Sequence, residues 1–386
     1  MDNERYNKTK VFVAACIGMC LFGISMVTVG SILPDITGAL HFDNMQAASL
    51  VTFIPVGMLV GSLLFGPVID RYGYKYMLVG GCLSVILGMF GLSVFKTLLL
   101  LQSSIALIGF GGGILNGETN ALVADISEEN KKASNMSFLG IFYGVGAICI
   151  PLLVGFLSAT LTYNAILVYF GIFMLAGVIF CTVIRYPRPK QSQGFPIKES
   201  FKLLKSGILP LFCLILFFEG GIESVSNNWT TSFLDQTTGL TKSEGLNALT
   251  FMILGMTVAR IFLVFLCRKF KPSSVLRASL LIATVGYVLL FDSPNNIKVY
   301  ISMMMIGLGL ASTYPVVLSG IGSSYSALSG TAIGIALTVG LVGQMLLNLL
   351  TGIISDSFGI GLFPMLIISC IVIMLILSTA VKENKN

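Results

Sequence analysis

The chain has 386 residues, of which 55% are hydrophobic and only 10% are charged, and its formal net charge is +6. A soluble protein carries about 25% charged residues, so this composition excludes a water-soluble enzyme, a disordered chain and a fibrous repeat. Apolar runs recur at about 20 residues, the length of helix that crosses a bilayer. The sequence therefore predicts an all-α polytopic membrane protein.

Apolar runs bounded by charged residues, proline or glycine clusters predict twelve transmembrane helices. The one long polar interval, 185–206, divides them six and six, and we interpret it as a cytoplasmic linker with a short amphipathic piece on the membrane surface. The predicted domains are an N-terminal six-helix bundle, 1–184, and a C-terminal six-helix bundle, 207–386. The predicted spans are 11–33, 46–69, 77–95, 98–124, 133–158, 162–184, 207–233, 244–267, 273–291, 297–320, 327–353 and 359–381.

The distribution of Lys and Arg predicts the orientation. With the N-terminus inside, the inner segments hold 19 of these residues and the outer segments hold 3. Cytoplasmic loops carry the excess of positive charge, so both termini are expected in the cytoplasm, and a nucleic-acid partner is not expected. The first apolar run continues to Leu33 without a cleavage site, which predicts a spanning helix and not a signal peptide. Short loops favour a bacterial inner membrane.

Cysteine and histidine usage predicts neither a metal nor a catalytic centre. All eight cysteines lie in apolar runs, where they act as small apolar residues, and His41 is the only histidine. No nucleophile–His–Asp set can be assembled, so we expect neither an enzyme nor a cofactor. The glycine run 109–113 lies within a span, where close helix packing explains it better than a phosphate loop.

One predicted cytoplasmic loop contains a motif that resembles the motif of a known family. The stretch GPVIDRYGYKYMLVGG, 66–81, places Gly66, Asp70, Arg71 and Gly73 at the spacing of the loop signature between the second and third helices, and it resembles that of the major facilitator superfamily. A glycine at 66 lets two helices approach closely, and a glycine at 73 permits a positive φ. The resemblance implies two six-helix bundles and secondary transport by alternating access.

Four further stretches together look like the fucose–glucose–galactose symporter branch of that family. The chain departs from the branch pattern at Gly30 and Asn116, where acids are expected, so the resemblance does not carry over the sugar or the proton relay. It also departs from the drug-antiporter signature, because Ile150 precedes Pro151. The stretches are GIESVSNNWTTSFL (221–234), GLGLASTYPVVLSG (307–320), YGVGAICIPLLVG (143–155) and GIISDSFG (352–359).

Charged side chains within the predicted spans are candidate functional residues, because inserting each at the middle of a membrane helix costs about 2.5–3.5 kcal/mol. Glu219 and Glu223 are four residues apart, on one helix face that Asn227 extends. We expect this face to line the cavity between the two halves. Glu223 is predicted to bind substrate or to transfer protons. For Glu219 two interpretations stay open, ion coupling and a structural pair that stabilises the bundle.

Further polar groups lie in other spans. Asn116 and Asn120 share a face and suit the recognition of hydroxyl groups, since each amide offers donors and an acceptor. Glu118 is rotated by about 200° onto the face of Asp125, where it could carry a proton or join an ion-pair network that closes the inner gate. Arg260 requires a carboxylate partner, and we expect a gate-forming salt bridge.

The last predictions concern uncharged and aromatic groups. Gln344 and Asn348 indicate a neutral, hydrogen-bonding ligand, and Trp229 is predicted as an interfacial anchor in preference to a sugar-stacking platform. The predicted solute contacts are Asn116, Asn120, Tyr143, Glu223, Asn227, Tyr314, Gln344 and Asn348; the predicted ion-coupling acids are Glu223, Glu118 and Glu219; and the predicted gating residues are Gly66, Asp70, Arg71, Gly73, Asp125 and Arg260.

The sequence therefore predicts a secondary active transporter of a small polar solute, most of all a sugar or a sugar-like compound. No ATP-binding domain is recognisable, so an ion gradient is expected to drive accumulation. The expected coupling cation is the proton, ahead of sodium, because a buried glutamate can load a proton on one side and release it on the other. A monomer in the lipid bilayer is expected. The alternatives are a proton-driven exporter of drugs or metabolites with the same fold, and a membrane receptor that binds ligand without transporting it.

Overall fold

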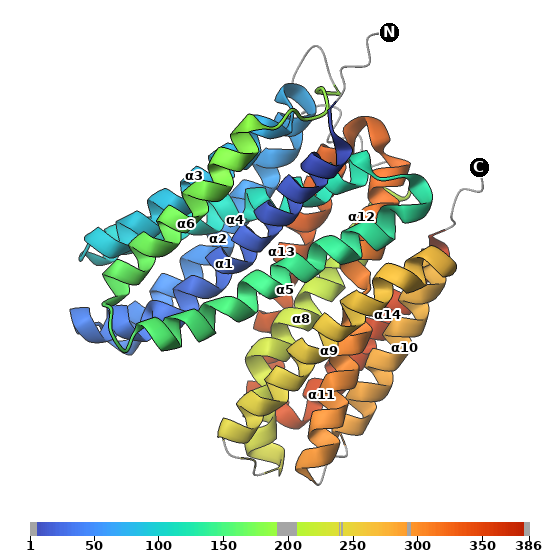
Figure 1. The fold of residues 1–386 in the computed structure, drawn as a ribbon. Helices are drawn as coiled ribbons and strands as arrows, with labels where there is room; N and C mark the ends of the chain where they lie inside the picture. Colours follow the sequence, from blue (N-terminus) through green and yellow to red (C-terminus); the bar gives the residue numbers. More distant parts are fainter. Residues whose placement is uncertain (1–5, 191–206, 239, 241, 292–294, 382–386) are drawn as a thin grey trace. The chain divides into compact units, whose positions relative to one another are not determined.

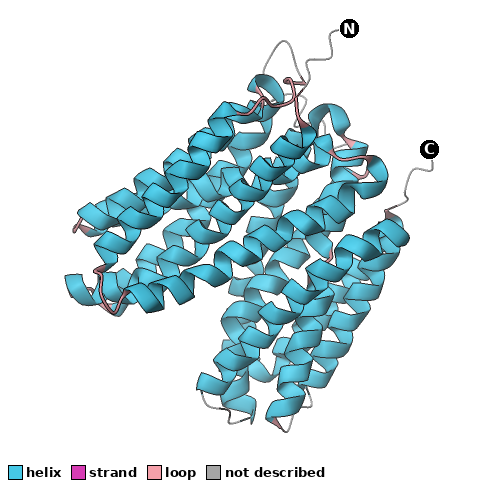
Figure 2. Cartoon of the chain, viewed as in Figure 1, coloured by secondary structure: helices cyan, strands magenta, loops and turns pink. Residues whose placement is uncertain are grey.

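The computed structural model of the chain describes residues 6–190, 207–238, 240, 242–291 and 295–381 (Figure 1). Within these ranges the secondary structure is helical and contains no strand (Figure 2). Twelve helical segments in the described part of the chain are long and apolar enough to cross a membrane. The predicted all-α polytopic fold is therefore confirmed.

The helices form two compact units. Unit 1 comprises the described parts of 1–127, 139–200 and 322–335, and unit 2 comprises the remainder. Two long helices contribute to both units: α5 begins in unit 2 and continues in unit 1, and α13 begins in unit 1 and continues in unit 2. The predicted linker stays a prediction, because 191–206, with the predicted surface piece, lies outside the described residues.

Unit 1 is organised around α4, which packs against α1, α2 and α3, while α3 also packs against α6. The glycine run of α4 permits these contacts, because a Cβ at Gly109 would lie 2.2 Å from the Ile54 oxygen, and one at Gly111 would lie 2.4 Å from the Gly81 oxygen. The run is a helix-packing surface, as predicted. The helices are α1 (Lys8–Leu40), α2 (Asn44–Tyr72), α3 (Tyr74–Val94), α4 (Leu98–Ile126), α5 (Lys132–Leu157) and α6 (Tyr163–Val183).

Unit 2 pairs α9 with α11 and α8, and α10 with α11 and α14. Its α8 also packs against α14, so each of these five helices buries part of its surface against two or more others. The helices are α8 (Leu209–Thr238), α9 (Lys242–Lys269), α10 (Pro272–Phe291), α11 (Asn296–Leu310), α12 (Thr313–Ser324), α13 (Ser329–Phe358) and α14 (Phe363–Ala380). Short 3₁₀ turns span Glu129–Lys131, Ser326–Leu328 and Ile360–Leu362.

The predicted span 297–320 lies within a segment long and apolar enough to cross a membrane, Asn296–Ser324, but its helix is not continuous. The segment is two helices, α11 and α12, interrupted at Ala311 and Ser312. Pro315 explains the interruption, because it has no N–H to donate to the carbonyl four residues earlier, that of Ala311. Conversely, the first helix is longer than predicted, since α1 continues past Pro34 to Leu40.

Candidate functional site

The turn from α2 to α3 and the start of α13 meet in unit 1. Gly73 joins α2 to α3 with a φ of +82°, which glycine adopts without steric cost. About two turns earlier, a Cβ at Gly66 would lie 2.5 Å from the Gly330 oxygen. The absence of a side chain at Gly66 therefore lets the backbone of α13 approach α2.

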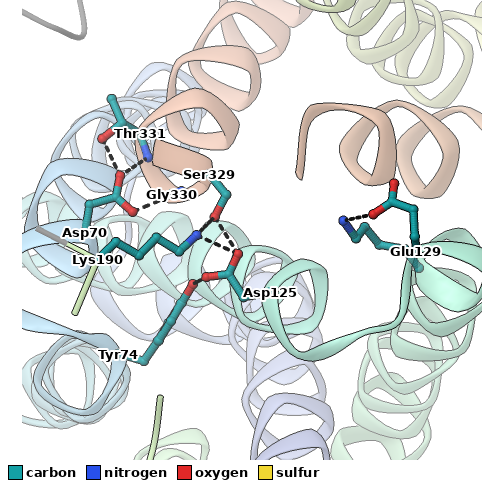
Figure 3. Close-up of polar contacts among 9 residues, drawn as sticks. Asp70, Tyr74, Asp125, Glu129, Lys190, Ser329, Gly330 and Thr331 are labelled. Atoms are coloured by element: carbon teal, nitrogen blue, oxygen red, sulfur yellow. Dashed lines mark hydrogen bonds and ion pairs between the residues drawn. The ribbon is translucent and has the colours of Figure 1, made fainter. Parts of the chain in front are cut away.

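Asp70 binds the first turn of α13 (Figure 3). It is 1% exposed, and its Oδ2 accepts hydrogen bonds from the Thr331 N–H at 2.8 Å and the Thr331 hydroxyl at 2.6 Å. Its Oδ1 accepts one from the Gly330 N–H at 3.3 Å. The first N–H groups of a helix have no partner within the helix and carry a partial positive charge, so this carboxylate stabilises the start of α13.

A second carboxylate, Asp125 at the end of α4, binds the residue before Gly330. The Lys190 Nζ lies 2.7 Å from the Asp125 Oδ1 and also donates to the Ser329 hydroxyl, which in turn donates to Asp125 at 2.7 Å. The Tyr74 hydroxyl donates to the other carboxylate oxygen (Figure 3). We call Asp70, Asp125, Lys190, Ser329 and Thr331 the α13-start cluster.

The sequence predicts the two acids of the α13-start cluster but not its other members. Lys190 lies within the long polar interval, directly after Pro189, and Ser329 and Thr331 lie about 200 residues from Asp125, so no local pattern marks them. Burial, with a smaller contribution from Asp125, raises the pKa of the hydroxyl of Tyr6, which lies two residues before α1. Arg71 lies in the last turn of α2, with its guanidinium 5.7 Å from the Tyr72 ring centroid.

The amides predicted in span 4 lie together on α4. The Asn120 Nδ2 donates to the Asn116 backbone oxygen at 2.8 Å and to its Oδ1 at 3.2 Å. Asn116 is half-buried, and Asn120 is 7% exposed. Tyr143 on α5 is half-buried, and its ring centroid lies 5.2 Å from that of Phe22 on α1.

Glu118 lies on a different side of α4, inside unit 1. It is fully buried, and the backbone N–H of Leu78 on α3 interacts with its carboxyl group. The groups that interact with it electrostatically are the hydroxyls of Tyr74 and Tyr186 and the thiols of Cys82 and Cys181. This environment contrasts with that of Asp125, which has Lys190 as its cation.

In unit 2, Asn348 on α13 is the centre of a polar cluster shared with α8. Its Nδ2 donates to the Ser224 hydroxyl at 2.7 Å, and its Oδ1 accepts from the Asn228 amide at 3.0 Å and the Trp229 indole N–H at 3.2 Å. The sequence analysis missed Ser224 and Asn228 here and assigned Trp229 to the membrane interface. We call Ser224, Asn228, Trp229 and Asn348 the amide cluster.

Two glycine contacts bring the helices of the amide cluster together. A Cβ at Gly220 would lie 2.6 Å from the Gly340 oxygen, and one at Gly343 would lie 2.0 Å from the Phe217 oxygen. Gln344, one turn before Asn348, is half-buried, and its backbone oxygen accepts from the Asn348 amide at 2.7 Å. The pattern GLVGQ, 340–344, therefore sets the register of α13 against α8.

The acids of α8 occupy two environments. Glu219 is fully buried, and the Thr313 hydroxyl interacts with its carboxyl group, whereas Glu223, one turn later, is half-buried. Arg260 on α9 interacts electrostatically with both carboxyl groups. Asn227 is exposed and donates to the Glu223 backbone oxygen at 3.0 Å. Tyr314, in the first turn of α12, is half-buried.

Comparison with known proteins identifies the family. A sequence model of the Major Facilitator Superfamily matches residues 15–346 and 211–385. This chain belongs to the major facilitator superfamily. Over 311 residues it is 25% identical to the glucose/mannose transporter GlcP of Bacillus subtilis, covering 77% of this chain and 76% of that protein. Over 383 residues it is 23% identical to the human sodium-dependent glucose transporter 1, covering 89% and 73%.

Solved structures of the family show the same fold. FucP in the outward conformation superimposes with a TM-score of 0.84 at 16% identity, covering 97% of this chain and 99% of that one. The proton:xylose symporter XylE gives a TM-score of 0.79 at 13% identity, covering 96% and 94%. This member of the major facilitator superfamily is an integral membrane protein with the twelve-helix fold, and it is a transporter and not an enzyme.

Proposed function

We propose that this transporter carries a small polar solute, a sugar or a sugar-like compound, in symport with protons. The amide cluster is the observation that supports the choice of solute. Its amide, hydroxyl and indole groups are uncharged and offer both donors and acceptors, the chemistry that binds hydroxyl groups. Named sugar transporters among the relatives agree with this choice.

The proposed solute contacts follow the polar groups of each unit. In unit 2 they are Asn348 and Gln344, with Glu223 and Asn227 on the neighbouring helix and Tyr314 on α12. Unit 1 contributes Asn116, Asn120 and Tyr143. Alternating access would expose these groups first to one side of the membrane and then to the other, which is how secondary transporters with two helical bundles work.

Proton coupling is proposed for the carboxyl groups, with Glu223 and Glu219 ahead of Glu118. Two carboxylates and one guanidinium carry a net charge of −1, and an uncompensated charge in the hydrocarbon region is costly. Protonation of one carboxyl group would make the set of Glu219, Glu223 and Arg260 neutral. The transporter could therefore load a proton with the solute on one side and release both on the other.

The orientation follows from the distribution of positive charge. We propose a bacterial inner membrane, a monomer, and both termini in the cytoplasm, because Lys and Arg are concentrated in the segments assigned to that side. In this orientation the α2–α3 turn and the α13-start cluster lie at the cytoplasmic face. Asp70 and Asp125 would then close the inner gate while the solute site is open to the outside.

Transport by purified protein in proteoliposomes tests the proposal. D-glucose, D-mannose, a polyol and an organic acid are supplied as labelled solutes with an inward pH gradient, an inward sodium gradient or neither. We expect a sugar to accumulate only with the pH gradient. Accumulation driven by sodium alone would contradict proton coupling, and the absence of flux with every solute would contradict sugar import.

A variant pair tests the role of Glu223. Glu223→Gln should abolish accumulation driven by the pH gradient while solute exchange between the two sides continues, because a neutral amide does not titrate. Asp235→Asn, which changes an exposed acid of the same helix, is the matched control and should accumulate solute as the wild type does. Normal accumulation by Glu223→Gln would remove Glu223 from the coupling role.

Export is the second candidate, because the chain is also 22% identical over 307 residues to multidrug resistance protein 1 of Bacillus subtilis, covering 78% of this chain and 77% of that protein. An exporter of apolar cations would make cells resistant to dyes such as ethidium. Expression in a dye-sensitive host with unchanged resistance would leave solute import as the function. Increased resistance that Asn348→Leu does not alter would favour export.

A further inference from the structure

The segment that follows α6 is fixed in unit 1 before the undescribed residues begin. Its sequence, RYPRPK over 185–190, alternates prolines with other residues, and each proline fixes its own φ and restricts the residue before it to an extended conformation. The Tyr186 hydroxyl donates to the Cys181 oxygen at 3.1 Å. The segment that leaves α6 is therefore conformationally restricted and is anchored to that helix.

Two further contacts hold this segment against the α2–α3 turn. The Pro189 ring lies beside Gly73, 3.5 Å from the position that a Cβ there would occupy. The Lys190 N–H donates to the Asp70 backbone oxygen at 3.1 Å. Side chain and backbone of Asp70 thus bind different partners, since its carboxylate binds the first turn of α13 and its carbonyl binds Lys190.

The side chain of Lys190 then completes the α13-start cluster (Figure 3). Its Nζ contacts the Asp125 carboxylate at 2.7 Å and the Ser329 hydroxyl, and the two charged side chains are only 21% and 11% exposed. An ion pair shielded from water is screened little, and removal of one partner leaves the other charge buried. Without Lys190, Asp125 would lose its only cation among the described residues and would still repel the Asp70 carboxylate.

We infer that Lys190 is a positioning residue that holds the first turn of α13 in unit 1. It neutralises Asp125 and bridges that acid to Ser329, so that Ser329, Gly330 and Thr331 stay bound to unit 1. The remainder of α13, with Asn348, belongs to unit 2. Release of this turn is therefore required whenever α13 moves with unit 2, and Lys190 sets how easily that release occurs. Its consequence for transport rests on the proposed function, whereas the effect on α13 does not.

Hydrogen–deuterium exchange of the full-length protein in detergent measures this release without any solute. In Lys190→Met, the amides of 329–335 should exchange about tenfold faster than in the wild type, because the local opening becomes more favourable. Lys190→Arg, which keeps the charge, should restore most of the protection. Lys131→Met removes a lysine from an exposed ion pair and is the matched control, with no expected change at 329–335.

Coupled variants separate this role from a general loss of stability. Asp125→Asn should accelerate exchange at 329–335, and the double variant with Lys190→Met should add little, because both changes remove one interaction. If Lys190→Met is not produced in membranes, Ser329→Ala removes the bridge and should give a smaller effect of the same kind. Unchanged exchange at 329–335, or equal acceleration there and in 132–138, would overturn the inference. Failed sugar uptake by the wild type would instead contradict only the proposed function.

Discussion

Two helix starts in this transporter are bound in different ways. The first turn of α13 is bound in unit 1 by two carboxylates, and Asp70 accepts hydrogen bonds directly from its backbone N–H groups. The first turn of α5 is bound in unit 2 through Ser134, whose hydroxyl donates to the Val264 oxygen at 2.6 Å and accepts from the Arg268 Nε at 3.0 Å. In each unit, the start of one helix meets the end of another helix that lies far away in the sequence.

The difference in hydrogen bonding gives two similar junctions a different resistance to opening. Hydrogen bonds to a charged group contribute about 1.5–3 kcal/mol each, against about 0.5–1.5 kcal/mol for neutral ones, and a carboxylate at a helix N-terminus gains further from the helix dipole. We therefore expect the α13 junction to resist opening more than the α5 junction. The following substitutions test that ranking, from the largest effect to the smallest.

Asp70→Ala should have the largest effect. It leaves the buried N–H groups of Gly330 and Thr331 without their acceptor, so we expect a loss of about 3 kcal/mol in the free energy of unfolding. Thermal unfolding in detergent measures the loss as a lower midpoint. Asp70→Asn, which keeps one oxygen acceptor without the charge, should lose about half as much. A midpoint equal to that of the wild type would show that this carboxylate does not stabilise α13.

Gly66→Ala should rank second, with a loss of about 2 kcal/mol from overpacking. The added Cβ would lie 2.5 Å from the Gly330 oxygen and 2.7 Å from the Thr331 Cα, and backbone atoms on both sides cannot rotate away. Gly80→Ala is the matched control, because nothing lies within 4 Å of its Cβ, and it should be neutral or slightly stabilising. The same assay applies, and equal midpoints for the two variants would refute the steric argument.

Ser134→Ala should cost about 1.5 kcal/mol, less than either change above, since it removes one neutral hydrogen bond and one from the Arg268 guanidinium at the α5 junction. Exchange of the amides in 132–138 should quicken in this variant, while 329–335 should stay as protected as in the wild type. A loss as large as that of Asp70→Ala would reverse the proposed ranking of the two junctions.

Lys131→Ala should have the smallest effect, below about 0.5 kcal/mol, because exposed ion pairs contribute little. The side chains of Lys131 and its partner Glu128 are 47% and 61% exposed. The unfolding midpoint should therefore match that of the wild type within error at both low and high salt. A clear destabilisation would indicate that the 3₁₀ turn before α5 contributes to its junction.

The sequence by itself determined the fold class and the number of spans. Twelve apolar runs near the length of a bilayer-crossing helix can form little else, because backbone groups within lipid must be satisfied inside each segment. Periodicity also paired Asn116 with Asn120 and Glu219 with Glu223, since residues four apart share a face of any helix. The GPVIDRYG stretch was sufficient to select Asp70 and Gly73 and to indicate the family.

Only the tertiary structure decided which of these side chains have partners. Lys190 reaches Asp125, and Trp229 reaches Asn348, through contacts that depend on how helices distant in sequence are packed. Glu118 and Asp125, which share a helix face, differ because, in the part of the chain that the structure describes, only Asp125 forms an ion pair. Helix periodicity is a property of a few consecutive residues, whereas a hydrogen bond across helices needs atoms placed to within a fraction of an ångström by all the packing around them.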